Sequence, residues 1–289
     1  MRIFLTGATF AENVDEGIRR AIREQKSNMR IFTSTVERWD QQKSVGLLLR
    51  EKKPLLWNLM SYFYCRRNIP FAEQVRDASE LILIDSGAHS FQKGTKVEWE
   101  SYTHEYAKFI REFDRPNVIG YFEMDVDNLI GYQKVLELRK ILHEESGHPE
   151  KIIPVWHRNR GIQDYKRMCD EHTGGIVAVT GFKNEDIRDE QYPMFLKEAW
   201  KRGCRLHCLG MTRKDILDKV PFDYTDSSSW AQQAIYGKVG KRKVSKEFSK
   251  TNREEVFKAS YLDAMKMQLH YYNKWRNVKG CSQTPANQN

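Results

Sequence analysis

The chain lacks an apolar run long enough to span a bilayer, and its amino terminus lacks a basic segment followed by an apolar one. Cysteine is scarce: the five cysteines are odd in number and scattered, which argues against a disulfide framework and indicates free thiols in a reducing compartment. There is also no internal repeat and no low-complexity domain. These absences favour a cytoplasmic globular protein without a membrane partner, in the host cytoplasm if a virus encodes it.

Negative charge is in deficit. The 48 Lys and Arg residues outnumber the 39 Asp and Glu residues, which gives a formal net charge of +9 and an isoelectric point near 9.2. Clustered cations gain affinity for a polyanion by releasing counterions from its phosphates. The balance therefore favours a nucleic-acid partner, although charge alone also suits a basic protein without one.

What the chain does contain is an alternation of strand-like and helix-like stretches over 289 residues, about the length of one (β/α)₈ barrel. The strand-like runs are residues 2–7, 81–85, 117–125, 151–157, 175–181, 204–210 and 222–226, and helical patterns include residues 99–113, 132–145 and 187–203. This order predicts a parallel α/β sheet. A single TIM-type barrel domain over residues 1–289 is the most economical interpretation, because seven or so units fill the length.

Residues 237–280 differ from the rest. They read as a glycine-punctuated basic loop followed by a long helix packed on the barrel, with residues 281–289 as a flexible tail. The loop is either a solvated surface or a nucleic-acid-binding surface. In the second case the cations that contact phosphates are Lys238, Lys241, Arg242, Lys243 and Lys246.

The aromatic stretch 57–67, WNLMSYFYCRR, also has two interpretations. It is typical of a buried helix or strand. Alternatively, Tyr62 and Tyr64 line a nucleic-acid groove with Arg66 and Arg67, by stacking and by phosphate contact.

Acidic residues stand at the ends of three predicted strands. Asp85 follows LILI, Asp226 follows FDYT, and the acidic cluster Glu123, Asp125 and Asp127 follows IGYF. Strand alternation puts Tyr121, Glu123 and Asp125 on one face. Catalytic groups of parallel α/β folds lie where the strands end. Each acid alone is more often a helix N-cap or a turn former, but converging carboxylates suit chemistry at an anomeric carbon, one as nucleophile and the other transferring protons.

Two stretches carry a resemblance to a known family. DSGAHSF, residues 85–91, is similar to the Asp-Ser-Gly-Gly-aromatic motif of the queuine tRNA-guanine transglycosylase superfamily. Residues 207–230, HCLGMTRKDILDKVPFDYTDSSSW, resemble that family's segment from a Gly-rich strand through a short helix to the nucleophilic aspartate. The chain most closely resembles the compact, virus-associated branch that is linked to inserting 7-deazaguanine bases into DNA, over roughly residues 80–237.

The resemblance implies roles for individual residues. Asp226 matches the nucleophile that attacks C1′, and Asp85 matches the acid/base that serves the departing and incoming bases. Glu123 and Asp125 are both eligible to read the amide and amino edge of the purine, and we prefer Asp125. His89 stands where the family has a stacking aromatic residue. The residues matched to base binding are Ser86, Gly87, His89, Glu123, Asp125, His157, Thr180, Gly181, Cys208 and Met211.

The chain departs from the tRNA-type members at their zinc site. Those members carry a cysteine cluster and a histidine after the nucleophile, whereas Cys281 is the only cysteine after Asp226 here. Cys204, His207 and Cys208 do not replace that site, because on a strand the two cysteines face one side and the histidine the other, and a fourth ligand is missing. We therefore expect no metal, and the resemblance implies neither ATP nor a redox cofactor.

The sequence thus predicts an enzyme that exchanges a guanine in a polynucleotide for a free 7-deazaguanine. DNA is favoured over tRNA, because the zinc-bearing module associated with tRNA use is missing. Three alternatives stay open: a tRNA-guanine transglycosylase, a noncatalytic nucleic-acid-binding barrel subunit, and a nucleoside-level deoxyribosyltransferase. The sequence does not determine which deazaguanine is used or which sequence context is chosen. It also leaves open the oligomeric state, including whether the protein forms a homo-oligomer.

Overall fold

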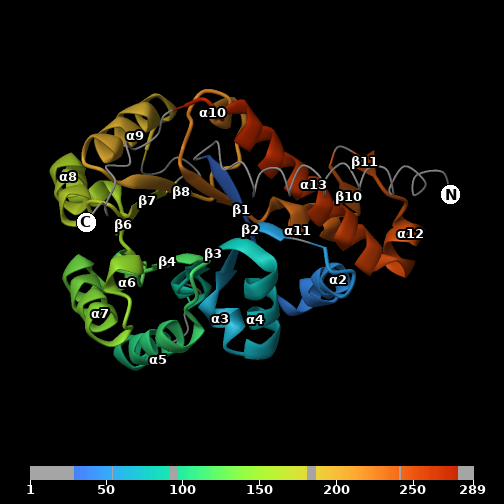
Figure 1. Cartoon of the computed structure of the whole chain (residues 1–289), viewed down its shortest axis with the longest axis horizontal. Coiled ribbons are helices and arrows are strands. Elements are labelled where there is room, and N and C mark those ends of the chain that lie inside the picture. The colour runs from blue at the N-terminus through green and yellow to red at the C-terminus, as the bar shows by residue number, and fades with distance from the viewer. Residues whose placement is uncertain (1–28, 54, 92–96, 181–186, 241, 279–289) are drawn as a thin grey trace, which may run out of the picture.

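The computed structural model describes residues 29–53, 55–91, 97–180, 187–240 and 242–278. Within these residues one sheet holds nine parallel strands in the order β5-β4-β3-β2-β1-β9-β8-β7-β6. The strands are β1 (Arg30–Ser34), β2 (Leu55–Ser61), β3 (Ser79–Asp85), β4 (Val118–Phe122), β5 (Ile152–Ile153), β6 (Val155–Trp156), β7 (Ile176–Thr180), β8 (Arg205–Leu209) and β9 (Tyr224–Ser227). The expected (β/α)₈ barrel is confirmed, because this sheet curls into a barrel surrounded by helices (Figure 1).

One short segment, residues 152–156, brings the two edges of the sheet together. β5 pairs with β4 through Phe122 and Ile153, whereas β6 pairs with β7 through Trp156 and Val179. Pro154 separates the two pieces and has no N–H group to continue a ladder, so the segment changes partner there. The described barrel therefore has eight strand positions, and β5 and β6 in residues 152–156 together fill one of them.

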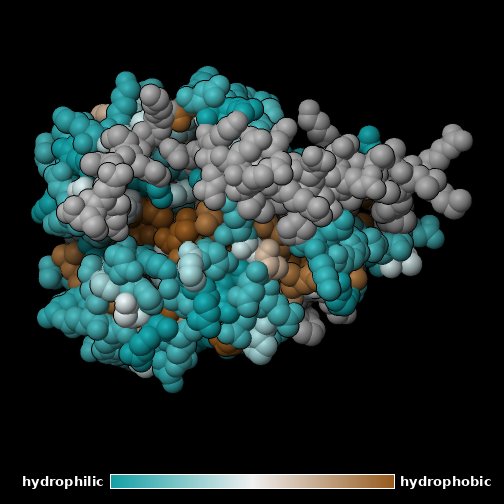
Figure 2. All heavy atoms as spheres, viewed as in Figure 1, coloured by the Kyte–Doolittle hydropathy of each residue, from teal (hydrophilic) through white to brown (hydrophobic). Residues whose placement is uncertain are grey.

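Helices follow the strands and form a ring around them when the molecule is viewed along the barrel (Figure 1). The longer ones are α2 (Trp39–Arg50), α4 (Ile69–Ala78), α5 (Trp99–Phe113), α7 (Tyr132–Glu145), α8 (Gly161–Glu171), α9 (Tyr192–Lys201) and α13 (Arg253–Lys274). Shorter helices are α3 (Tyr62–Cys65), α6 (Asp127–Ile130), α10 (Lys214–Leu217), α11 (Ser229–Ile235) and α12 (Lys246–Thr251), with 3₁₀ turns η1 (Ala88–Phe91), η2 (Pro149–Lys151), η3 (Arg158–Arg160) and η4 (Asp189–Gln191). In the same view, apolar residues gather in a patch near the middle of the uncovered face, and hydrophilic residues make up most of the remaining visible surface (Figure 2).

The long helix α13 is bonded directly to the barrel strands β1 and β2. The Gln268 side-chain amide donates hydrogen bonds of 2.7 Å to the carbonyls of Ile31 in β1 and Trp57 in β2. The Tyr261 hydroxyl donates to the Asn58 side chain at 2.7 Å, and both residues are buried. These bonds join α13 to both β1 and β2.

The sequence predicted some elements closely and missed others. The helical patterns 99–113 and 132–145 coincide with α5 and α7, while the basic stretch read as a loop forms a hairpin of β10 (Lys238–Val239) and β11 (Arg242–Lys243) before α12. The strand β1 was not predicted, and the predicted strand 2–7 lies outside the described residues.

The described part of the chain contains no helix that is both long and apolar enough to cross a membrane.

Candidate active site

The predicted acids lie at the carboxyl end of the barrel. Asp85 is the last residue of β3, Asp226 is the third residue of β9, and Asp125 follows the end of β4. All strands of the barrel run parallel, so their carboxyl ends open on the same side. The pKa of Asp85 is raised to about 6, mainly by burial and further by the negative charges of Asp125 and Asp226. The charges of Asp125 and Asp226 therefore act on Asp85 across the barrel mouth.

Asp226 is held by donors from two neighbouring strands and the turn after one of them. The imidazole Nε2 of His207, in β8, lies 3.0 Å from Oδ1, and the backbone N–H of Gly210 donates to the same oxygen at 2.8 Å. The Ser34 hydroxyl at the end of β1 donates to Oδ2 at 3.1 Å. His207 is fully buried inside the barrel, so it fixes the orientation of the carboxylate from below. Neither His207 nor Ser34 was predicted to contact Asp226.

The turn after Asp85 requires the predicted glycine. Gly87 has φ +79°, and a Cβ there would lie 2.4 Å from the Cβ of Phe63. Its N–H donates to Asp85 Oδ2 at 2.9 Å, which lowers the pKa of that carboxyl against the effect of burial. Ser86 is fully buried, and its carbonyl accepts a hydrogen bond of 2.8 Å from the Tyr102 hydroxyl. The Asp85–Gly87 turn therefore fixes the Asp85 carboxylate, and the turn itself contacts α3 and α5.

Glu37 is a buried acid close to Asp85 that the sequence did not single out. Its Oε1 accepts the Ser61 N–H at 3.1 Å, and Ser61 pairs with Asp85 across β2 and β3. The pKa of Glu37 is raised to about 8, mainly by burial, and the charge of Asp85 is a smaller part of that shift. The sequence signal for Glu37 is that polar residues, Ser34, Thr35 and Glu37, follow the apolar residues of β1.

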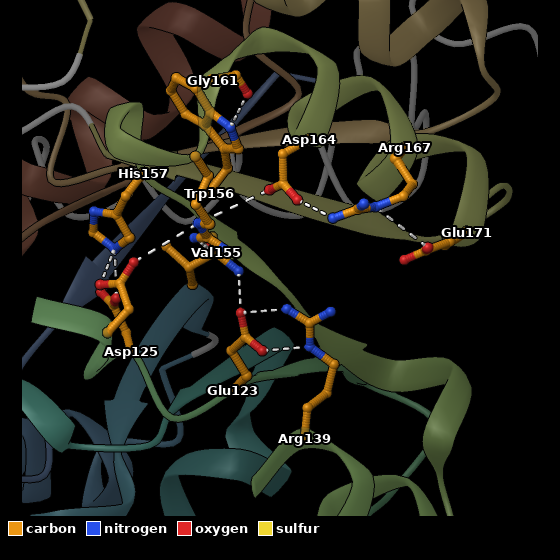
Figure 3. A network of polar contacts seen from close by, with 12 residues as sticks. Glu123, Asp125, Arg139, Val155, Trp156, His157, Gly161, Asp164, Arg167 and Glu171 are labelled. Carbon is orange, nitrogen blue, oxygen red and sulfur yellow. Dashed lines mark hydrogen bonds and ion pairs between the residues drawn. The ribbon is translucent and has the colours of Figure 1, made fainter. Parts of the chain in front are cut away.

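A second polar cluster joins the ends of β4 and β6 (Figure 3). The His157 Nε2 lies 2.6 Å from Asp125 Oδ1 and 3.6 Å from Asp127 Oδ1. Asp127 has a nearly buried side chain, and the Arg160 Nε lies 3.7 Å from its Oδ2. Within the described ranges, Asp125, Asp127 and His157 are the group whose ligand atoms are close enough to hold a divalent cation. The Arg160 guanidinium competes with a cation for the Asp127 carboxylate.

Glu123, one of the two acids considered for base reading, points to Arg139 and Val155 and not to the Asp125–His157 pair (Figure 3). It is 1% exposed, and Arg139 of α7 approaches it at 2.6 and 3.1 Å. The Val155 N–H donates to the same carboxylate at 2.7 Å. The predicted alternation does not extend to Asp125, because β4 ends at Phe122 and the chain then leaves the strand. Asp125 is the acid of this segment that reaches the mouth.

Two of the predicted base contacts were wrong. Cys208 and Met211 are fully buried in the apolar cluster between the strands and the helices α8 and α9, so they do not line the mouth. Their neighbour Leu209 packs instead on the other cluster, with interior residues such as Ala178. As predicted, Cys204 and Cys208 face opposite to His207, so these three residues do not form a metal site.

The aromatic ring of the DSSSW motif also has a structural role. Trp230 is 2% exposed, and its indole N–H donates to the Ser34 carbonyl at 2.8 Å. It therefore anchors the end of β1 beside Asp226.

The remaining predicted residues are placed unevenly. Thr180 is the last residue of β7, at the carboxyl edge, and the chain continues into Gly181, which lies outside the described residues. His89 lies in η1 and Lys246 begins α12, but their side chains are outside the described part of the structure, as is all of Lys241. Lys238, Arg242 and Lys243 are exposed on the hairpin, which lies outside the ring of helices beside α13 (Figure 1).

Comparison with known proteins supports the fold. No protein-family model matches the chain, and no curated protein matches it. Among solved structures, a protein from Coccidioides immitis assigned as a fructose-1,6-biphosphate aldolase is 12% identical, with a TM-score of 0.53 over 91% of this chain and 97% of that one. The tryptophan synthase complex of Pyrococcus furiosus contains a chain that is 13% identical, with a TM-score of 0.48 over 84% of this chain and 98% of that one. At 12% identity, the likeness to the structure from Coccidioides immitis concerns the fold alone.

Proposed function

We propose that this barrel is a base-exchange transglycosylase, a pentosyltransferase that replaces guanine in DNA with a free 7-deazaguanine. The observation that carries the proposal is that Asp85, at the end of β3, and Asp226, in β9, lie at the same carboxyl end of the parallel barrel. Burial, and to a smaller degree the charges of Asp125 and Asp226, raise the pKa of Asp85 there. The resemblance of DSGAHSF and of the segment ending in DSSSW to the queuine tRNA-guanine transglycosylase superfamily assigns the chemistry.

In the proposed reaction, Asp226 attacks C1′ of the target nucleotide as the bond to guanine breaks. The products are a glycosyl ester of Asp226 and a guanine that takes its proton from Asp85. The 7-deazaguanine then attacks the same carbon, its proton passes to Asp85, and the ester bond breaks. Two displacements retain the configuration at C1′. The donors on Asp226 support this role, because they hold its carboxylate in one orientation at the mouth.

The pKa of Asp85 suits an acid that later acts as a base. A value of about 6, raised mainly by burial, means that both protonation states are accessible near neutral pH. Asp125 lies at the same mouth, and its carboxylate is fixed by His157. We assign to it the reading of the donor edge of the purine, since a carboxylate accepts from N–H groups.

DNA is the proposed polymer, since Cys281 is the only cysteine after Asp226 and the tRNA-type cysteine cluster is missing. A base inside a duplex must be flipped out or presented in a single strand. The test is mass spectrometry of nucleosides digested from DNA and from tRNA of cells that express the protein with a deazaguanine pathway. We expect deazaguanine in DNA. Modification of tRNA alone would overturn the polymer, and modification of neither would favour a noncatalytic nucleic-acid-binding barrel.

A further inference from the structure

A group of arginines lies on aromatic rings beside the Asp85 turn. The Arg67 Cζ is 4.7 Å from the ring centroid of Phe63 and 5.8 Å from that of Tyr64. The Arg66 Cζ is 5.1 Å from the ring centroid of Tyr102 in α5, and the Arg38 Cζ is 5.5 Å from that of Tyr64. We call Arg38, Tyr64, Arg66 and Arg67 the α3 surface. It combines residues from the segments that follow β1 and β2.

The α3 surface has the two chemical features that single-stranded nucleic acid requires. A guanidinium over a ring keeps its charge and directs N–H groups outward, while lying in a fixed plane. Arg66 and Arg67 are exposed, and Tyr64 is partly exposed, so cations and a ring face solvent together. The Arg66–Glu105 contact of 3.6 Å is an exposed pair that solvent and salt weaken.

This surface adjoins the candidate active site directly. The Cβ of Phe63 lies 2.4 Å from the position a Gly87 Cβ would take, so α3 and the Asp85–Gly87 turn are in contact. Ser61, which precedes α3, pairs with Asp85 itself. Tyr102, whose ring lies under Arg66, also donates its hydroxyl hydrogen bond to the Ser86 carbonyl. A phosphate or base on the α3 surface therefore lies next to a sugar held at the barrel mouth.

From this geometry we infer that the α3 surface binds the phosphates and one stacked base of the nucleotides that flank the target in a single DNA strand. The inference rests on the proposed function for its polymer and concerns a different step, binding before exchange. The hairpin lies outside the helical ring, so it contacts phosphates farther along the strand (Figure 1). The α3 surface carries the binding of short strands.

Binding to single-stranded DNA of about six nucleotides, a length within the usual site size of such surfaces, tests the inference by fluorescence anisotropy over a range of salt. Arg66→Ala with Arg67→Ala should weaken binding about tenfold or more and lower the salt slope by ~1.4, since each single-strand phosphate contact contributes ~0.7. Arg66→Lys with Arg67→Lys should keep the slope and still weaken binding, because lysine does not stack flat. Tyr64→Ala should weaken binding about tenfold without changing the slope.

The matched control is Lys108→Ala with Lys140→Ala, which removes the same charge from exposed positions on the outer helices α5 and α7. It should leave six-nucleotide binding within about twofold, since distant exposed charges are screened. A second arm, Arg242→Ala with Lys243→Ala, should weaken longer strands and spare the short one. The inference would be overturned if the Arg66→Ala/Arg67→Ala double variant bound the short strand as the wild type does. It would also be overturned if the Lys108/Lys140 or the Arg242/Lys243 double variant lost as much short-strand affinity as the Arg66/Arg67 variant.

The outcome separates this inference from the proposed function. Binding that depends on Arg66 and Arg67, without any base exchange, would keep the surface and refute the transglycosylase. Exchange on DNA with short-strand binding that ignores both arginines would do the reverse.

Discussion

Acidic residues occur at both ends of the barrel, but they have different surroundings. At the amino end, Glu80 of β3 accepts the Trp57 indole N–H at 2.6 Å, and Asp223 before β9 accepts the Trp200 indole N–H and the Leu206 N–H, both at 2.8 Å. At the carboxyl end, burial and then the charges of Asp125 and Asp226 raise the pKa of Asp85. Each acid at the amino end pairs with its own donors, whereas the acids at the carboxyl end have donors and also lie near other carboxylates.

The same contrast occurs within each of two strands. In β3, Glu80 is the second residue and Asp85 is the last. Asp223 directly precedes β9, and Asp226 is the third residue of that strand. Burial raises the pKa of Asp223 to about 6, as it does for Asp85, so the pKa alone does not distinguish the two ends. Their neighbours do. Function is assigned to the end where several carboxylates meet and not to a perturbed pKa by itself.

The largest expected effect separates Asp226 from Asp223. Asp226→Asn should lower base exchange by roughly 10⁴-fold or more, since removal of a nucleophile abolishes the covalent route. Oligonucleotide binding should change little, because the carboxylate acts on C1′ and not on phosphates. Asp223→Asn is the matched control and should keep its activity per folded molecule. Exchange assays with anisotropy binding measure both, and normal turnover by Asp226→Asn would refute the assignment.

Asp85 should show the next largest effect and a pH signature. Asp85→Asn should slow guanine release and deazaguanine entry by roughly 10²–10⁴-fold, the usual contribution of a general acid or base. In the wild type, single-turnover release of guanine should fall as pH rises through about 6, because only the protonated carboxyl donates. The variant should lose that inflection, and Glu80→Gln at the other end of β3 should keep it. An unchanged pH profile in Asp85→Asn would assign the proton to another group.

Asp125 should affect base choice more than rate. Asp125→Ala should raise the KM for the free base by roughly tenfold to a hundredfold, the range for a hydrogen bond to a charged group, and should broaden the bases accepted. Glu123→Gln is a useful comparison, because Glu123 pairs with Arg139 away from the mouth and should alter stability without altering base preference. Competition between bases measures the difference. A loss of selectivity in Glu123→Gln alone would reverse the assignment.

The smallest effect on activity is expected at the amino end, where stability should change. Asp223→Ala leaves the Trp200 and Leu206 N–H groups without their acceptor and should lower the free energy of unfolding by roughly 2–4 kcal/mol. The folded-state pKa of Asp223 is raised, so its carboxyl holds a proton longer in the folded state. Its contribution to the unfolding free energy should decrease as pH rises from 3.8 to about 6, and the variant should lose this pH dependence. Denaturant unfolding at several pH values checks both expectations.

The sequence by itself determined the barrel class and the candidate acids. Alternating strand and helix patterns with helices such as Trp99–Phe113 require a parallel α/β fold, because their periodicity fixes which faces are buried. The position of Asp85 and Asp226 at strand ends then placed both at one edge, since parallel strands share their direction. Neither step needs a long-range contact. Local pattern and chain direction suffice.

Only the tertiary structure decided which neighbours these acids have. Ser34 and Asp226 are separated by 192 positions, and they meet because β1 lies beside β9 in the closed barrel. The end of β4 at Phe122 turned Asp125 to the mouth and left Glu123 on Arg139, against the alternation expected from the sequence. Cys208 failed as a base contact because the pleat of β8 directs it to the helices. Strand pairing and the exact end of each strand depend on the whole packed barrel, and no local pattern encodes them.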